Sequence, residues 1–154
     1  MHVIEKSIWI NRPLEEVFDF HADHANRATW HEHVHSSKMI TPPPVGLGSR
    51  FEIDAITARR PTPMTIEITA FDRPHAYTYR SKAAYRTASA IAITDSHQTF
   101  TAENGGTRFQ IRAELHFQGL ARLFGWFIVK FGLERHIETA VQELKTEMEK
   151  DRSA

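Results

Sequence analysis

Three histidines follow Trp30 at every second position, a residue type and spacing that could bind a metal ion. On an extended strand, His31, His33 and His35 would share one face, because successive side chains of a strand point to opposite sides. Imidazole nitrogens are frequent zinc and copper ligands. However, no carboxylate at an obvious fixed spacing completes the set, and strand histidines are commonly solvated. We therefore predict a surface strand or a strand at the mouth of a pocket, with no metal and no other cofactor.

A second group of residues combines tyrosine hydroxyls with an imidazole. In a dry pocket, Tyr77, Tyr79 and Tyr85 with His97 could act as general acid and base, for example to enolise and dehydrate a polyketone. Strand tyrosines commonly pack with the hydroxyl at the rim, so a structural role is the competing interpretation. We find no nucleophile elbow, phosphate-binding loop or paired-carboxylate motif.

The C-terminal stretch, residues 119–151, is the element that we expect to position the functional residues of the chain. It is the only long run without proline and is rich in helix formers, which predicts one long C-terminal helix. Its apolar residues form two stripes about 130° apart on a helical wheel. The change of stripe predicts a bend, a widened turn or a break between Gly125 and Gly132. Ordinary core packing is one explanation of both stripes. The other is that the aromatic first half covers a cavity while the second half docks on a sheet.

The composition excludes several classes of protein. The chain has 154 residues, which suits one domain spanning residues 1–154. It has no cysteine, which excludes disulfides, thiol catalysis and thiolate metal sites. Lysine plus arginine and aspartate plus glutamate number 19 each, so no net charge attracts nucleic acid. The longest apolar run, 126–129, is too short to span a membrane, and we expect a cytoplasmic protein.

The remaining patterns predict one strand, two short helices and about six further strands before the C-terminal helix. We place the strands at 2–10, 33–40, 50–57, 64–71, 75–81, 89–103 and 107–118, and the short helices at 13–21 and 23–29. The last strand alternates most clearly, with Phe109, Ile111, Ala113, Leu115 and Phe117 on one face. A curled antiparallel meander covered by one helix leaves a cavity, which here should be apolar and suit a lipid-like or aromatic molecule.

The segment 10–30, INRPLEEVFDFHADHANRATW, resembles the opening of the START-like, polyketide-cyclase superfamily (SRPBCC). Further similarities are Gly46-Leu47-Gly48-Ser49, the turn Phe71-Asp72-Arg73-Pro74, Gly106-Thr107 and the terminal helix, so the resemblance covers nearly the whole chain. It implies an α+β helix-grip fold, in which a seven-stranded antiparallel sheet curls around a long C-terminal helix and a deep hydrophobic pocket, with two short helices after the first strand. The superfamily includes lipid-transfer domains, hormone and allergen-type carriers, coenzyme-Q-binding proteins and aromatase/cyclase enzymes, and the matched positions are scaffold positions shared by all of them.

We therefore expect the chain to bind a hydrophobic small molecule, lipid-like or polyketide-like, between the sheet and the C-terminal helix. One alternative is a polyketide cyclase/dehydratase-type enzyme that uses the tyrosines and histidine of the pocket. Another is a protein-interaction or dimerisation module that uses the apolar first half of the helix, with the chain a monomer or a homodimer. The expected ligand-binding residues are Trp30, Tyr77, Tyr79, His97, Phe117, Leu123, Phe124, Phe127 and Phe131, although Trp30 could instead be a structural plug.

Overall fold

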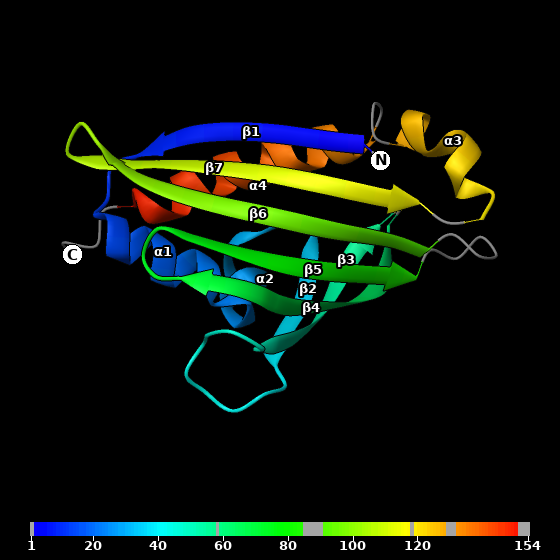
Figure 1. Cartoon of the computed structure of the whole chain (residues 1–154), viewed down its shortest axis with the longest axis horizontal. Helices are drawn as coiled ribbons and strands as arrows, with labels where there is room; N and C mark the ends of the chain where they lie inside the picture. Colours follow the sequence, from blue (N-terminus) through cyan, green and yellow to red (C-terminus); the bar gives the residue numbers. More distant parts are fainter. Residues whose placement is uncertain (1, 58, 85–90, 118, 129–131, 151–154) are drawn as a thin grey trace.

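A single antiparallel sheet of seven strands forms the framework of the computed structural model, which describes residues 2–57, 59–84, 91–117, 119–128 and 132–150. The strand order is β1-β7-β6-β5-β4-β3-β2, so β1 and β7 are neighbours although they lie at opposite ends of the sequence. The elements are β1 (His2–Ile10), α1 (Leu14–Ala22), η1 (His24–Asn26), α2 (Arg27–Trp30), β2 (Val34–Met39), β3 (Arg50–Thr57), β4 (Arg60–Asp72), β5 (Ala76–Ala84), β6 (Ile91–Glu103), β7 (Gly106–Phe117), α3 (Ala121–Ile128) and α4 (Glu134–Met148). In Figure 1, α4 runs along one face of the sheet behind β1 and β7, while α1 and α2 lie toward the opposite edge. The predicted fold class is confirmed.

The short helices after β1 position the first polar groups of the interior. α1 begins directly after Pro13, whose fixed φ suits a helix start, and it buries Val17, Phe18 and His21 on one face. The side chain of Asp23 accepts a hydrogen bond from the backbone N–H of Ala25 at 3.1 Å and so caps the next turn. The chain then enters α2, which carries Arg27 and Trp30.

The hairpin between β6 and β7 fixes the register of the sheet centre. Asn104 and Gly105 both have positive φ, 49° and 77°, which matches the Asn-Gly turn signal. A Cβ at Gly106 would lie 2.5 Å from the carbonyl oxygen of Ile10, so only glycine lets β1 approach this closely. On β7, the predicted alternation holds for Phe109, Ile111, Ala113 and Leu115, which are buried, whereas Phe117 is half-buried at the end of the strand.

The C-terminal region contains two helices, α3 and α4, and a widened turn at Gly132 agrees with the bend, widened turn or break that we predict between Gly125 and Gly132. α3 ends at Ile128, and residues 132 and 133 form a wider, π-type turn directly before α4; residues 129–131 lie outside the described part. The change of helix falls where the apolar stripe changes face. α4 buries one stripe, Val141, Leu144 and Met148, whose spacing matches a helix docked on one surface.

Of the seven strands, β1 and β3 have the predicted bounds, and β2 and β4 differ in where they begin. β2 begins at Val34 rather than at residue 33, so His31 and His33 precede the strand and do not share a strand face with His35. The reason is that α2 extends to Trp30 and a turn follows it. β4 begins at Arg60, earlier than predicted, and includes Pro61 and Pro63, which pair in register with Ile56 and Asp54 of β3.

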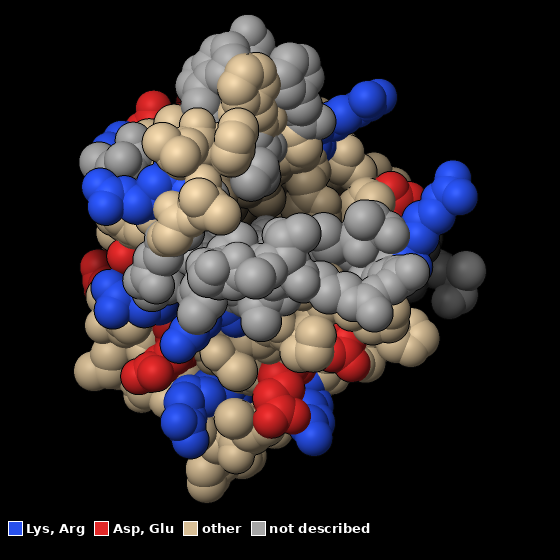
Figure 2. Space-filling view, turned by 90° about the vertical axis from the view of Figure 1, so that its right-hand side faces the viewer, with Lys and Arg blue, Asp and Glu red and all other residues tan. Residues whose placement is uncertain are grey.

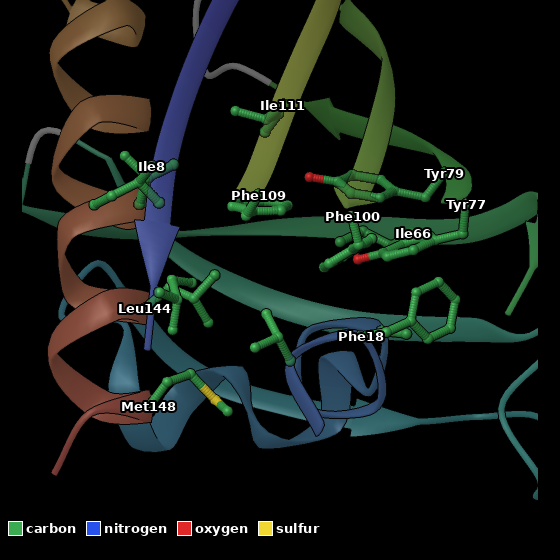
Figure 3. Close-up of a cluster of buried hydrophobic side chains, with 14 of the residues drawn as sticks. Ile8, Phe18, Ile66, Tyr77, Tyr79, Phe100, Phe109, Ile111, Leu144 and Met148 are labelled. Carbon is green, nitrogen blue, oxygen red and sulfur yellow. The ribbon is translucent and has the colours of Figure 1, made fainter. Parts of the chain in front are cut away.

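The main core lies between the sheet, α1 and α4. Figure 3 shows its side chains: Phe18 reaches from α1, Leu144 and Met148 from α4, and Tyr77, Phe100 and Phe109 from the strands. A smaller cluster of Ile4, Ala113 and Leu115 continues it toward the start of α4. No helix in the described part of the chain is both long enough and apolar enough to cross a membrane.

Candidate ligand cavity

A cavity of about 390 Å³ lies between the sheet and α4, a volume within the usual range for small-molecule sites. The strands contribute Val34, Ile53, Ala55, Ile56, Thr62, Met64, Tyr79, Ser81, Thr94, Ser96, Phe109, Ile111, Ala113 and Leu115. The helices and connecting segments contribute His21, Arg27, Trp30, His31, His33, Gly132, Leu133, His136, Ile137, Ala140, Val141 and Leu144. Because strand side chains alternate, every second residue of β7 reaches this space. The wall is mostly apolar, and its polar groups come mainly from the segment 21–33 and from His136.

Of the predicted ligand-binding residues, Trp30 and Tyr79 line the cavity. Figure 3 shows Tyr79 extending from β5 toward Phe109 and Ile111 of β7, which also line it. Tyr77 does not line it. Its ring is buried against Phe18 and Phe100, one layer deeper in the core.

His97 lies on the other face of the sheet from Tyr77 and Tyr79. It pairs in register with Thr78, whose side chain points away from the two tyrosines, and its Nδ1 lies 3.0 Å from the Thr78 hydroxyl oxygen. Its side chain is exposed and its Nε2 lies 3.7 Å from Glu114. The predicted acid–base set therefore does not assemble, because the strand alternation separates its members. Tyr85 lies outside the described residues.

The aromatic first half of the C-terminal region also differs from expectation. Leu123, Phe124 and Phe127 on α3 are 73%, 59% and 53% exposed and do not line the cavity. Phe117 packs edge-on against the ring of His2 and is likewise absent from the wall. Phe131 lies outside the described residues. α4 forms the helical wall instead, through the apolar stripe that we expected only to dock on the sheet.

Figure 2 views the end of the molecule where α3 lies. On this face, lysine and arginine side chains are interspersed with aspartate and glutamate and do not gather into a patch of one sign. This view agrees with the zero net charge of the sequence.

Three histidine rings meet at the polar end of the cavity. The ring centroid of His136 lies 5.1 Å from that of His31 and 4.8 Å from that of His33. Burial first, and then the positive charge of Arg27, lowers the pKa of His31 to about 3. Burial together with His33 lowers the pKa of His136 to about 4. Among the described residues, no group of three or more histidine, aspartate or glutamate side chains has positions that could hold a metal ion.

A carboxylate orients the first of these rings. Nδ1 of His31 lies 2.6 Å from Oε2 of Glu143 on α4, and the same oxygen accepts the backbone N–H of Glu32 at 3.3 Å. An ionised carboxylate only accepts hydrogen bonds, so the network assigns the proton to Nδ1 and leaves a lone pair on Nε2 of His31. Such a pair fixes the tautomer of a histidine in the same way as in acid–base enzymes.

A second buried network lies behind the cavity wall. The hydroxyl oxygen of Tyr77 is 2.6 Å from Nδ1 of His21 and 3.3 Å from Nε2 of His24. Burial, followed by the charge of Arg27, lowers the pKa of both histidines well below its usual value. Burial raises the pKa of Tyr77. At neutral pH all three rings are therefore uncharged and serve to support Trp30 and the cavity wall.

Sequence reasoning missed Arg27, His136 and Glu143. Local spacing carries no signal for them, because His31 and Glu143 are 112 residues apart. His97 could have been assigned correctly from the sequence. Phe100 marks the buried face of its strand, and residues at odd spacing from it must point outward.

Comparison with protein families and solved structures gives a consistent result. Residues 1–149 match the model of the family described as polyketide cyclase / dehydrase and lipid transport. A comparison with curated proteins finds no match.

Three solved structures illustrate the likeness of fold. The protein TTHA0849 of Thermus thermophilus is 14% identical, with a TM-score of 0.77 over 96% of this chain and 97% of that one. Ara h 8.0201 is 14% identical, with a TM-score of 0.74 over 96% of this chain and 97% of that one. The di-domain ARO/CYC BexL from the BE-7585A biosynthetic pathway is 18% identical, with a TM-score of 0.71 over 97% of this chain and 50% of that one. At these identities the likeness shows the fold alone, and the family match over residues 1–149 carries the assignment. The chain belongs to the polyketide cyclase/dehydrase and lipid transport family of the SRPBCC superfamily.

Proposed function

We propose that the chain binds a hydrophobic small molecule, lipid-like or aromatic, in the cavity between the sheet and α4. The observation that carries the proposal is a space of about 390 Å³ with a mostly apolar wall, built from β3, β4, β7 and α4. Moving apolar surface of a ligand from water into such a wall is favourable by about 25 cal/mol per Å². The family description, which names polyketide cyclases and lipid transport, supports the same class of ligand.

Among the described residues, the predicted ligand-binding ones fall into two groups, those that line the cavity and those, such as the residues on α3, that do not. Trp30 and Tyr79 are proposed to touch the ligand, together with Ile111 of β7 and Val141 of α4, because all four line the cavity. The exposed residues of α3 are proposed to stay outside the site.

A cavity-filling variant tests this proposal. Ala140 lies half-buried on the cavity side of α4, so Ala140→Trp should fill the space and abolish binding of the uncharged apolar dye Nile red. Leu123→Trp adds the same indole to the exposed face of α3 and is the matched control, which should bind the dye as the parent does. Dye fluorescence reports binding, and thermal unfolding checks that both variants fold.

The opposite pattern would contradict the proposal. If Leu123→Trp abolishes dye binding and Ala140→Trp does not, the ligand binds on α3 and the interaction-module interpretation gains support. If the parent binds no dye at any concentration tested, the cavity does not serve as an apolar binding site.

The pair His31–Glu143 favours one second candidate, an enzyme of the cyclase/dehydratase type. With the tautomer assigned above, Nε2 of His31 has a lone pair that could accept a proton from an activated carbon of a polyketone. Because the pKa of His31 is lowered to about 3, the imidazole alone is a weak base, and this candidate requires the negative charge of the forming enolate to raise that pKa. The test is cyclisation of a linear polyketone surrogate, followed by absorbance. His31→Gln should remove the enzymatic rate and retain Nile red binding; a parent rate equal to that in buffer would contradict this candidate.

A further inference from the structure

We propose that the ligand is an amphipathic organic acid whose carboxylate binds Arg27 while its apolar part fills the rest of the cavity. This inference rests on the proposed function, since it assigns the chemical class of the molecule that occupies the same cavity. The evidence for a carboxylate is the distribution of charged groups in the cavity wall. The volume and the apolar character of the cavity give no information about a charged group on the ligand.

The described wall of the cavity contains a permanent positive charge and no carboxylate. Arg27 is half-buried there, and its guanidinium makes no hydrogen bond or ion pair with any described residue. Every aspartate and glutamate of the sequence except Asp151 belongs to the described part. By contrast, the exposed arginines Arg73, Arg80 and Arg112 each have a carboxylate oxygen at 2.7 Å. Arg27 is thus a half-buried cation that lacks a counter-ion among the described residues.

An unpaired cation beside an apolar wall is unfavourable unless something compensates it. Here the ring of Tyr79 compensates in part, because the guanidinium carbon of Arg27 lies 5.6 Å from the ring centroid. This contact also holds the guanidinium against the wall. A ligand carboxylate would complete the compensation, since the planar guanidinium can donate two parallel hydrogen bonds to it.

The neighbouring titratable groups do not neutralise Arg27. Its positive charge lowers the pKa of His21, His31 and His136, each of which also lines the cavity and is already lowered by burial. These rings are uncharged at neutral pH. The half-buried carboxylate of Glu143 is engaged by His31 and by a backbone N–H, and it does not line the cavity.

The hydroxyl of Tyr79 supplies a second group that points to a polar ligand. Tyr79 is 8% exposed, lines the cavity, and its hydroxyl has no hydrogen-bond partner among the described residues. The hydroxyl oxygen itself is not fully buried, so a molecule in the cavity can reach it. A ligand oxygen held by Arg27, or a second oxygen on the same molecule, would give it one.

The rest of the wall defines the apolar part of the ligand. Ile53, Met64, Ile111, Leu115, Ile137 and Val141 present hydrocarbon side chains from both the sheet and α4. A molecule with one carboxylate and an aliphatic or aromatic body therefore satisfies the whole cavity. An aliphatic and an aromatic apolar part both suit this wall, and the experiment below distinguishes the two kinds of ligand.

The experiment compares acids with their uncharged esters. The probes are cis-parinaric acid, which is aliphatic, and 1-pyrenebutyric acid, which is aromatic, each with its methyl ester, titrated by fluorescence at pH 7. The parent should bind at least one acid about tenfold or more tightly than the ester, as a charge-assisted hydrogen bond implies. Arg27→Met should remove this preference and leave ester binding unchanged, while Arg27→Lys should keep part of it. Arg50→Met is the matched control, because Arg50 is exposed and outside the cavity wall.

The outcomes separate this inference from the proposed function. If the parent binds acids and esters equally, or if Arg27→Met weakens both equally, the carboxylate site is refuted and the apolar cavity remains supported. If neither acids nor esters bind, both proposals fail. Ester binding by Arg27→Met also serves as the folding control for that variant.

Discussion

Two phenylalanines that face each other in the sheet allow a direct test of whether the cavity is empty space or packed core. Phe100 of β6 and Phe109 of β7 are paired in register, with ring centroids 5.1 Å apart. They are 2% and 1% exposed, so burial does not distinguish them. Only Phe109 lines the cavity. Alanine at each position removes the same ring from the same sheet.

The expected losses differ because of what surrounds each ring. Phe100→Ala opens a new void in filled core, and such truncations cost about 3–5 kcal/mol. The ring of Phe109 already lacks packed atoms on its cavity side, so its removal breaks fewer dispersion contacts and enlarges a space that exists. We expect Phe109→Ala to lose about 2 kcal/mol, roughly 1–3 kcal/mol less than Phe100→Ala.

Urea unfolding, followed by fluorescence and circular dichroism, measures both losses. Coincident transitions and similar m-values would justify subtracting the two free energies of unfolding. Phe109→Ala should also still bind Nile red, since its cavity grows. Equal losses, or a larger loss for Phe109→Ala, would show that Phe109 is packed on all sides and would refute the reasoning.

Two further predictions concern pH and a close backbone contact. Burial, with His33 and Arg27, lowers the pKa of His136 from 6.5 to about 4, so the unfolded chain binds more protons in this window. The contribution of His136 should be complete above about pH 6.5 and fall toward pH 4 by up to about 1.4 kcal/mol per pH unit, in addition to the contributions of His21, His24 and His31, whose pKa values burial also lowers. His136→Gln should reduce the total slope by this amount in urea unfolding, and an unchanged slope would contradict the assignment. A Cβ at Gly106 would lie 2.5 Å from a backbone oxygen of β1, so Gly106→Ala should lose about 1–3 kcal/mol. Gly46, which has nothing within 4 Å of such a Cβ, is the control, and Gly46→Ala should change stability by less than about 1 kcal/mol; equal effects in thermal unfolding would count against the contact.

The sheet could be predicted from the sequence because its signals are local. Alternation along β7 and the Asn104-Gly105 turn each depend on a few neighbouring residues, and both match the structure. The position where the C-terminal helix changes direction could be predicted for the same reason, since the apolar stripe moves to another face near Gly132. The stripe on α3 looked like the wall of a cavity because apolar periodicity predicts burial but does not identify the partner surface.

The polar end of the cavity could not be predicted, because it depends on tertiary contacts. His31 and Glu143 meet only when α4 packs beside α2, and no spacing in the sequence records that packing. The absence of a counter-ion for Arg27 among the described residues is likewise visible only in the folded chain. His31 and His33 gain a third imidazole from α4 rather than from His35, since the turn after α2 takes them off the strand.

The most direct test of the central claim is to locate an apolar probe on the protein. In methyl-labelled protein saturated with Nile red, intermolecular nuclear Overhauser effects report which side chains touch the dye. We predict contacts with methyl groups of Ile53, Ile111 and Ile137, which line the cavity from the sheet and from α4. Contacts confined to Leu120 and Leu123 near α3, or no contact with any cavity methyl at saturating dye, would contradict the claim that the ligand binds between the sheet and α4.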